Sequence, residues 1–239
     1  MRQEAYFCTV KELDELGKNN IPRQLISHTH LIYSSPATLA FNSPGAEGFG
    51  VKRAGLAVPD SVMLIVSPGC CGRNTSVLSS MRAYQDRFYY LLMDETDIVT
   101  GRHLKKIPKA VAEICEGLKK KPSVVMICIT CVDALLGTDM ERVCHKAEEY
   151  AGVPVRPCYM YALTREGRKP PMVHVRQSVY SLLEPKKKKG NVVNLLGYFS
   201  PLTDDCELYD LLHGAGVKTI HEISRCKDYE QYQTMSEAN

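Results

Sequence analysis

The stretch Lys121–Met140, KPSVVMICITCVDALLGTDM, contains the clearest predicted element of the chain. Its residues Val124–Thr130 are apolar, β-branched or cysteine without polar alternation, which is typical of a parallel strand covered on both faces. Cys131 follows where this strand should end, and ligands of open α/β sheets gather outside the carboxyl ends of the strands. Cys131 is therefore a candidate functional residue. A turn and a capping box for the next helix are predicted from Gly137, Thr138 and Glu141.

A second apolar run, Val62–Val66, is followed at once by Ser67-Pro68-Gly69-Cys70-Cys71-Gly72. The glycines permit a tight turn and close backbone approach, and residues 74–85 predict a helix after it. A thiolate at a helix N-terminus is stabilised by the helix dipole and the free amides, which suits a metal ligand. We therefore expect Cys70 and Cys131, two cysteines at strand ends of one sheet, to face the same crevice.

The chain from residue 61 to residue 184 alternates predicted strands and helices. This order predicts an α/β fold with a Rossmann-like, right-handed, doubly wound parallel sheet. One further βαβ unit, over residues 192–223, is small for a domain because three or more strands are normally needed. The second α/β domain is therefore expected to be incomplete. The predicted strands are 62–66, 88–93, 123–130, 153–157, 192–196 and 217–223, and the predicted helices lie near 74–86, 103–119, 139–151, 172–184 and 205–213.

Composition changes along the chain predict four parts. Residues 1–40 form an N-terminal arm with a short helical piece around residues 10–18, and residues 41–184 form the Rossmann-like domain. Residues 185–190 are a lysine-rich, solvated linker, and residues 191–239 begin the second domain. The glycine-rich segment 41–50 includes Gly45 and predicts either a close approach of the backbone to a partner or an ordinary turn.

Composition also argues against several classes of protein. The 239 residues are 44% hydrophobic, enough for a sizeable core. The formal charge of +3 and the lack of a basic stripe with aromatics give no support for nucleic-acid binding. The sequence predicts neither a membrane span nor a secretory signal. We expect a cytoplasmic protein, where its ten cysteines point to metal rather than disulfides.

Other cysteines and polar residues give weaker candidates. Cys128 and Cys131 form a CxxC, but if both lie on one strand their side chains point to opposite faces, so a redox or zinc pair would need a turn between them. Cys115 and Cys144 lie in predicted helices, where cysteine behaves as a small hydrophobe. No second CxxC, GxGxxG, P-loop or HExxH occurs. Polar residues of predicted turns are usually only solvated, and those that would lie nearest the site are Arg73, Glu95, Asp97 and Arg102.

Four motifs, in sequence order, resemble those of the nitrogenase component 1 family. Over residues 40–223 the chain is similar to the α and β subunits of the molybdenum–iron protein and to their relatives in protochlorophyllide reduction, nickel-tetrapyrrole reduction and nitrogenase-cofactor assembly. The resemblance implies that the chain corresponds to the N-terminal part of such a subunit. The motifs are Asn42-Ser43-Pro44-Gly45, Ser67-Pro68-Gly69-Cys70, Thr100-Gly101 with the helix from Leu104, and Thr130-Cys131 followed by Leu136-Gly137-Thr138-Asp139.

In that family, cysteines of three such loops bind an iron–sulfur cluster between two subunits, and an ATP-dependent iron protein supplies electrons. By position Cys70 matches the second ligand and Cys131 the third, while Cys71 could replace Cys70. Ala46 stands where the first ligand is expected. A cluster of the [4Fe-4S] type takes four thiolates, so the resemblance implies a cluster shared by two copies of the chain or with a paralogous subunit.

Three functions stay open at this point. The first is an oxidoreductase subunit that relays electrons through a cluster held at a subunit interface by Cys70 and Cys131. The second is a scaffold that assembles or carries a metallocluster without turnover. The third is a truncated relative whose cysteines are only structural. No residue matches the cysteine and histidine anchors of the family's catalytic cofactor, so the resemblance does not imply nitrogen fixation.

Overall fold

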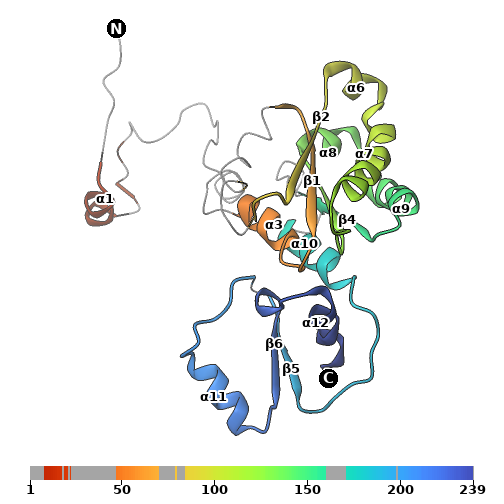
Figure 1. Ribbon diagram of the computed structural model, residues 1–239. Helices are drawn as coiled ribbons and strands as arrows, with labels where there is room; N and C mark the ends of the chain where they lie inside the picture. Colours follow the sequence, from red (N-terminus) through yellow and green to blue (C-terminus); the bar gives the residue numbers. More distant parts are fainter. Residues whose placement is uncertain are drawn as a thin grey trace. The chain divides into compact units, whose positions relative to one another are not determined.

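Two buried apolar runs form the centre of a parallel sheet in the computed structural model (Figure 1). The strands β1 (Val62–Ser67) and β3 (Val125–Ile129) are buried along their whole length. They are flanked by β2 (Phe88–Leu92) and β4 (Val155–Tyr159), giving the order β2-β1-β3-β4 with every pair parallel. The predicted strands are confirmed.

The structure describes residues 8–17, 19–20, 22, 47–69, 79, 84–159, 171–197 and 199–238. The chain divides into two compact units, residues 1–39 and 40–239, and each is described by itself. In the first unit, α1 (Val10–Leu16) begins at a capping box in which the side chains of Thr9 and Glu12 each accept from the other residue's backbone N–H. This helix corresponds to the short helical piece predicted there.

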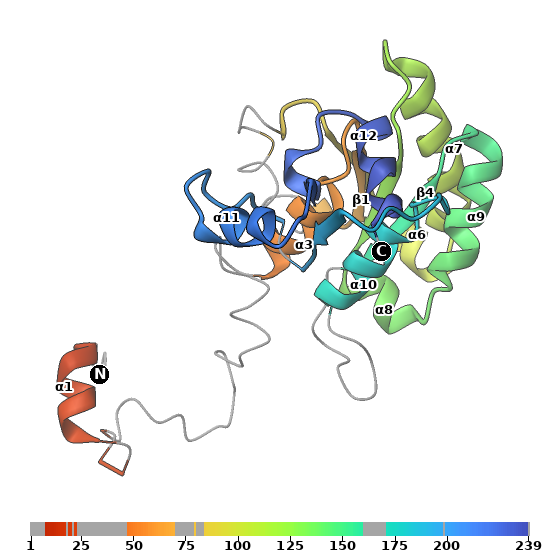
Figure 2. The same cartoon turned by 90° about the horizontal axis from the view of Figure 1, so that it is seen from below.

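Helices cover both faces of the four-stranded sheet. On one face, α3 (Glu47–Gly55) and α10 (Pro171–Tyr180) contribute residues to one core cluster. On the other face, α7 (His103–Gly117) and α9 (Met140–Ala151) contribute to a second cluster, and Figure 2 shows these two helices side by side. The doubly wound α/β architecture predicted from the sequence is therefore confirmed.

The alternation of side chains along β1 explains why its sequence shows no polar residue. Met63 and Ile65 belong to the cluster beneath α3 and α10, whereas Leu64 and Val66 belong to the cluster beneath α7 and α9. Neighbouring side chains of a strand point to opposite faces, so both sets must be apolar when both faces are covered. The same reasoning applies to β3.

Three helices occur where the sequence predicted loops or turns. The glycine-rich segment becomes helical from Glu47 onward as α3. The polar turn over residues 94–102 contains α6 (Glu95–Thr100), which starts at a reciprocal Asp94–Asp97 capping box. The turn after β3 begins with α8 (Cys131–Leu136). In each case local hydrogen bonding allows a helical turn in a segment whose composition suggests a loop.

The predicted capping box at the start of α9 is wrong. Asp139 is the N-cap of this helix, and its carboxylate accepts a hydrogen bond from the Arg142 backbone N–H at 3.1 Å. The Thr138 hydroxyl instead donates to the carboxylate of Asp133 on α8 at 3.0 Å. The residue next to the expected cap therefore caps the helix, and Thr138 contacts the preceding helix.

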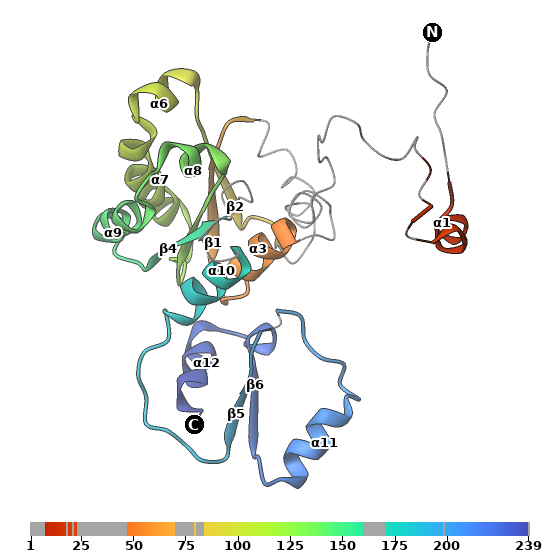
Figure 3. The ribbon, with the colours of Figure 1, turned by 180° about the vertical axis from the view of Figure 1, so that it is seen from behind.

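A second, two-stranded parallel sheet follows the lysine-rich segment. It pairs β5 (Val192–Leu195) with β6 (Thr219–Glu222), and α11 (Glu207–Gly214) forms the crossover. Figure 3 shows α11 and α12 (Tyr229–Gln233) on either side of this sheet. The chain also forms the short 3₁₀ helices η4 (Ile223–Arg225) and η5 (Thr234–Glu237).

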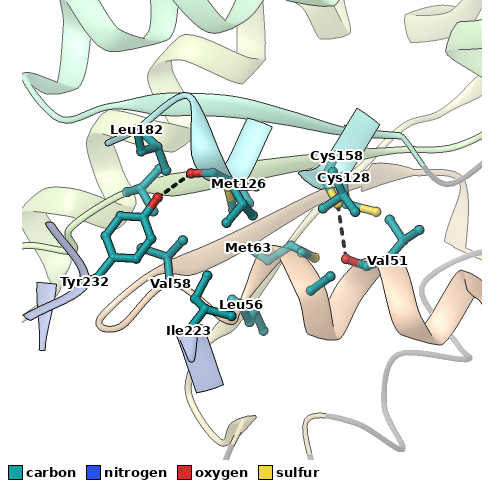
Figure 4. Packing of buried hydrophobic residues seen from close by; sticks show 14 of the residues in the cluster. Val51, Leu56, Val58, Met63, Met126, Cys128, Cys158, Leu182, Ile223 and Tyr232 are labelled. Atoms are coloured by element: carbon teal, nitrogen blue, oxygen red, sulfur yellow. Dashed lines mark hydrogen bonds between the residues drawn. The ribbon is translucent and has the colours of Figure 1, made fainter. Parts of the chain in front are cut away.

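The C-terminal segment packs into the core beneath α3 and α10. Tyr232 of α12 is fully buried, and its hydroxyl donates to the backbone carbonyl of Val179 on α10 (Figure 4). Ile223 and Met235 belong to the same cluster. Burial raises the pKa of the Tyr232 phenol, so this side chain stays a neutral donor. These contacts attach the second sheet to the first domain.

Candidate functional site

The strand order of the four-stranded sheet defines where a ligand is expected. From β1 the chain crosses to β2 on one side, and β3 then pairs with the opposite edge of β1. Such a reversal is a topological switch point, and ligands of open α/β sheets bind outside the carboxyl ends of the strands that flank it. We therefore take the carboxyl ends of β1 and β3 as the candidate site.

The predicted cysteines follow these two strand ends. Cys131 is the first residue of α8, two positions after the end of β3, and its side chain lies outside the described atoms. Cys70, Cys71 and Gly45 lie outside the described residues. Gly69 is described and exposed, two residues after the end of β1. The strands that precede the two cysteines in the sequence are adjacent in the sheet, whereas metal binding by Cys70 and Cys131 stays a prediction.

Two buried hydroxyl groups at this edge were not predicted from the sequence. Ser67, the last residue of β1, and Thr130, directly after β3, are each about 1% exposed. Within the described part of the chain, neither Ser67 Oγ nor Thr130 Oγ1 has a hydrogen-bond partner. A buried hydroxyl without a partner is costly, and hydrogen bonds to cluster sulfurs tune iron–sulfur sites. Hydroxyl donors at the carboxyl ends of β1 and β3 are therefore chemically compatible with a metal–sulfur cluster.

A buried polar network supports α8 from behind. His103 Nε2 lies 2.9 Å from Asp133 Oδ1, and His103 Nδ1 donates to the backbone carbonyl of Asp97 at 3.0 Å. Both side chains of the pair are buried, and Thr138 donates to the same oxygen of Asp133. Because both ring nitrogens face oxygens, the pair is either imidazolium with carboxylate or imidazole with carboxyl. The network fixes α8, and with it the backbone of Cys131, relative to α6 and α7.

The hydrogen bond between His103 and Asp133 was not predictable from the sequence, because the two residues are thirty positions apart. Only the tertiary fold brings α7 against α8. The carboxylate also keeps one unpartnered atom: Asp133 Oδ2 is buried without a hydrogen bond among the described residues. A carboxylate oxygen accepts hydrogen bonds only. A donor from a bound group or from water would satisfy it.

Asp97, predicted as a weak candidate in a solvated turn, is buried and ion-paired. Its carboxylate accepts from Lys106 Nζ at 2.6 Å and from Arg102 Nε at 2.8 Å, and its backbone carbonyl holds His103. The Lys106 ammonium first, and then the Arg102 guanidinium, hold the pKa of the Asp97 carboxyl well below its usual range. Glu95 is exposed, and Arg73 lies outside the described residues. Asp97 therefore supports the site structurally.

This ion-pair cluster predicts a pH-dependent loss of stability. The pKa of Asp97 in the folded chain lies below its value of about 3.9 in the unfolded chain. The ionised carboxylate therefore adds to the free energy of unfolding above about pH 3.9, and this stabilisation is lost as the pH falls through the folded pKa. Asp97→Asn should lower the urea midpoint by a constant amount between about pH 5 and pH 8. The difference from wild type should shrink steadily below about pH 4.

Urea unfolding followed by circular dichroism at a series of pH values measures this difference. Glu95→Gln is the matched control, because it removes an exposed carboxylate from the same helix and should leave the midpoint unchanged. If the difference in urea midpoint between Asp97→Asn and wild type were the same at pH 3 and pH 7, the assignment of the low pKa to this carboxyl would be contradicted.

A cleft of about 560 Å³ adjoins the buried network at the ends of α6 and α8. Its wall is partly apolar, and three cationic side chains, those of Lys105, Arg142 and Lys146, line it. Asp139 is the single acidic residue of the lining, and its carboxylate already caps α9. This local excess of positive charge favours an anionic ligand or partner next to the site.

The remaining described cysteines do not form a metal site with the candidate edge. Cys128 points into the core beneath α3 and α10, and Cys144 into the opposite core. Cys131 belongs to α8 rather than to β3, so the CxxC spans two elements. Among the described side chains, no group of three or more His, Cys, Asp or Glu is arranged to hold a metal. Cys70, Cys71 and the Cys131 side chain are not among those described side chains.

The fold is that of a doubly wound α/β protein with a parallel sheet and a switch point between β1 and β3. The chain belongs to the nitrogenase component 1 type oxidoreductase family, whose family model matches residues 47–239. The resemblance stated from the sequence motifs is thereby confirmed. Within the described residues, no helix combines the length and the apolar character needed to cross a membrane.

Known relatives agree with this family. The chain is 28% identical over 176 residues to the nitrogenase iron-molybdenum cofactor biosynthesis protein NifE of Rhizobium meliloti, covering 71% of this chain and 37% of the relative. It is 26% identical over 216 residues to NifE of Klebsiella pneumoniae, covering 82% and 47%. The solved structure "Nitrogenase Cp1 at pH 6.5" superposes with a TM-score of 0.55 at 20% identity, covering 78% and 39%. The chain spans less than half the length of these relatives.

Proposed function

We propose that the chain takes part in assembling or carrying a metal–sulfur cluster, without catalysing substrate turnover itself. The observation that carries this proposal is the similarity to the NifE proteins, whose name assigns them to biosynthesis of the iron-molybdenum cofactor. The electron-relay subunit, which was the first of the functions left open by the sequence, has less support from these relatives. In this proposal the cluster is the cargo of the protein and not its resident cofactor.

The architecture supports a cluster-handling site at the switch point of the sheet. The loops that carry Cys70 and Cys131 follow adjacent parallel strands. Ser67 and Thr130 place at the same edge hydroxyl donors that have no partner among the described residues, and these could donate hydrogen bonds to thiolate or sulfide sulfur. In this proposal the two cysteines hold the cluster, the hydroxyls orient it, and the His103–Asp133 pair keeps α8 in place.

The number of cysteines at this edge supports an oligomer. One chain offers two thiolates in matching loops, Cys70 and Cys131, because Ala46 stands where a third ligand is expected. A cubane cluster takes four thiolates. Two copies of the chain, or one copy with a paralogous subunit, complete the set. The cationic cleft lined by Lys105 and Arg142 favours approach of an anionic cluster or an acidic partner surface.

The experiment is anaerobic iron–sulfur reconstitution, with iron and sulfide counted per chain and the oligomeric mass measured. We expect about four irons per dimer in the wild type and loss of this iron in Cys70→Ser plus Cys131→Ser. Cys115→Ser is the matched control, because this half-buried cysteine lies on α7 in the second core layer. Iron uptake by the double variant equal to wild type would overturn the site.

A transfer assay separates the two functional classes. The loaded chain is mixed with an apo-acceptor protein that lacks its cluster, and iron is counted on each protein after separation. Transfer supports an assembly role. Reduction of the bound cluster by an ATP-dependent iron protein, without transfer, would instead support the electron-relay subunit. Failure of the wild type to take up iron, alone or with a paralogous subunit, would leave the cysteines structural.

A further inference from the structure

Two cysteines outside the candidate site lie directly opposite each other on neighbouring strands. Cys128 of β3 and Cys158 of β4 are register partners in the parallel ladder, and both are fully buried in the core beneath α3 and α10. Figure 4 shows the two side chains next to each other beside Val51. Both are free thiols. Neither takes part in the proposed cluster site.

The helix α3 surrounds this pair with polar groups that are unusual for an apolar core. The Cys158 thiol donates to the backbone carbonyl of Val51 at 3.5 Å. The side chain of Lys52, about 1% exposed, lies close enough for its ammonium charge to act on both sulfurs. A methyl group added at Gly55 would lie 3.3 Å from Cys158 Sγ, so the backbone of α3 closes directly over this sulfur.

The two thiols differ in acidity because they interact. The neighbouring Cys158 thiol first, and then the charge of Lys52, lower the pKa of Cys128. The Cys128 sulfur beside it, and then burial, raise the pKa of Cys158. By contrast, burial raises the pKa of the lone thiol Cys144 in the other core layer. One member of the pair is thus suited to be a nucleophile, and the other holds a proton next to it.

We propose that Cys128 and Cys158 form an oxidisable dithiol that a peroxide converts into a disulfide between β3 and β4. The Cys128 thiolate attacks one peroxide oxygen, the O–O bond breaks, and hydroxide leaves with the proton of Cys158. The Cys158 thiolate then attacks the sulfenic sulfur of Cys128, the S–S bond forms, and the second hydroxide takes the proton that Cys128 had released. Two thiols and one peroxide give one disulfide and two waters.

The strand geometry permits this bond. Neighbouring strands lie about 4.7–4.9 Å apart, which falls within the Cα separation of about 4.4–6.8 Å that disulfides span. Both side chains belong to the same face of the sheet because they are register partners in one core cluster. Both sulfurs are fully buried, so a glutathione-type disulfide is too large to react with them, and the oxidant in this proposal is a small molecule, hydrogen peroxide.

The test exposes the folded, fully reduced chain to hydrogen peroxide and follows each cysteine by alkylation and peptide mass mapping. We expect a form that has lost two hydrogens, with the peptides of Cys128 and Cys158 cross-linked, and recovery of both thiols with dithiothreitol. Cys128 and Cys158 should lose their thiols about tenfold faster than Cys144. Cys144 serves as an internal control because it is buried in the opposite core layer of the same chain.

Variants sharpen the result. Cys158→Ser should allow sulfenic acid to accumulate on Cys128, detected with dimedone, whereas Cys144→Ser should cross-link as the wild type does. The oxidation rates of Cys128 and Cys158 relative to Cys144 in the wild-type chain test the proposal even if Cys158→Ser fails to fold. Oxidation of Cys144 at the same rate as the pair would overturn the proposal. Cross-linking that occurs only after unfolding in urea would also overturn it.

Discussion

Replacing Asp133 with alanine should lower the free energy of unfolding by about 3–5 kcal/mol, because it removes one partner of a buried pair and leaves the other without compensation. Asp133 is fully buried, and its Oδ1 atom is the hydrogen-bond partner of both His103 and Thr138. Urea unfolding of the variant and the wild type at pH 7 measures the loss. A variant that unfolds in the same urea concentration as wild type would show that the network contributes nothing to stability.

Two further variants separate the parts of this network. Thr138→Val keeps the shape but removes one hydroxyl donor, so the expected loss is about 0.5–1.5 kcal/mol. Asp133→Asn retains an oxygen acceptor at the same place, so its loss should fall between those of Thr138→Val and Asp133→Ala. If Asp133→Ala also reduces iron uptake in a chain that is still folded, the network positions α8, and with it Cys131, in addition to stabilising the fold.

Tyr232→Ala should cost about 3–5 kcal/mol, the range for removing a buried aromatic side chain. The ring fills the core between α10 and the C-terminal segment, together with Ile223 and Met235. Its hydroxyl also donates to the carbonyl of Val179. Loss of this contact is expected to expose the second sheet first, and limited proteolysis should therefore cut the variant within residues 185–238 before the first domain.

Tyr232→Phe is the matched control for this prediction. It keeps the ring but removes the hydroxyl donor, and because the Val179 carbonyl still accepts from the Leu182 backbone N–H, the expected cost is about 0.5–1.5 kcal/mol. Thermal unfolding by calorimetry compares the three proteins. Equal transition temperatures for Tyr232→Ala and wild type would mean that the C-terminal segment does not contribute to the cooperative unit.

The strands and the long helices were predictable because their signals are local. β1 and β3 are continuous apolar runs, which only a strand covered on both faces accommodates. The buried side chains of α7, including Ile107, Val111 and Ile114, recur at helical spacing. The short helices α6 and α8 were missed because six-residue segments carry almost no periodicity, although Asp94 and Asp97 formed a recognisable capping pattern.

The candidate site was predictable only in its location. The sequence predicted cysteines at the ends of two parallel strands, and the strand order places those ends side by side at the switch point. It did not predict the buried hydroxyls of Ser67 and Thr130, because a single serine or threonine at a strand end is most often solvated. Binding of a cluster by Cys70 and Cys131 stays a prediction for the reconstitution experiment.

The amino-acid sequence by itself determined the α/β class, the parallel strands, the family and the loops that carry the candidate ligands. Each of these depends on patterns within a few neighbouring residues. Only the tertiary structure decided that His103 meets Asp133, that Asp97 is buried, and that Cys128 lies opposite Cys158 in the strand register. These contacts join residues far apart in the chain, and the strand register and helix packing that create them are set by burial of the whole core.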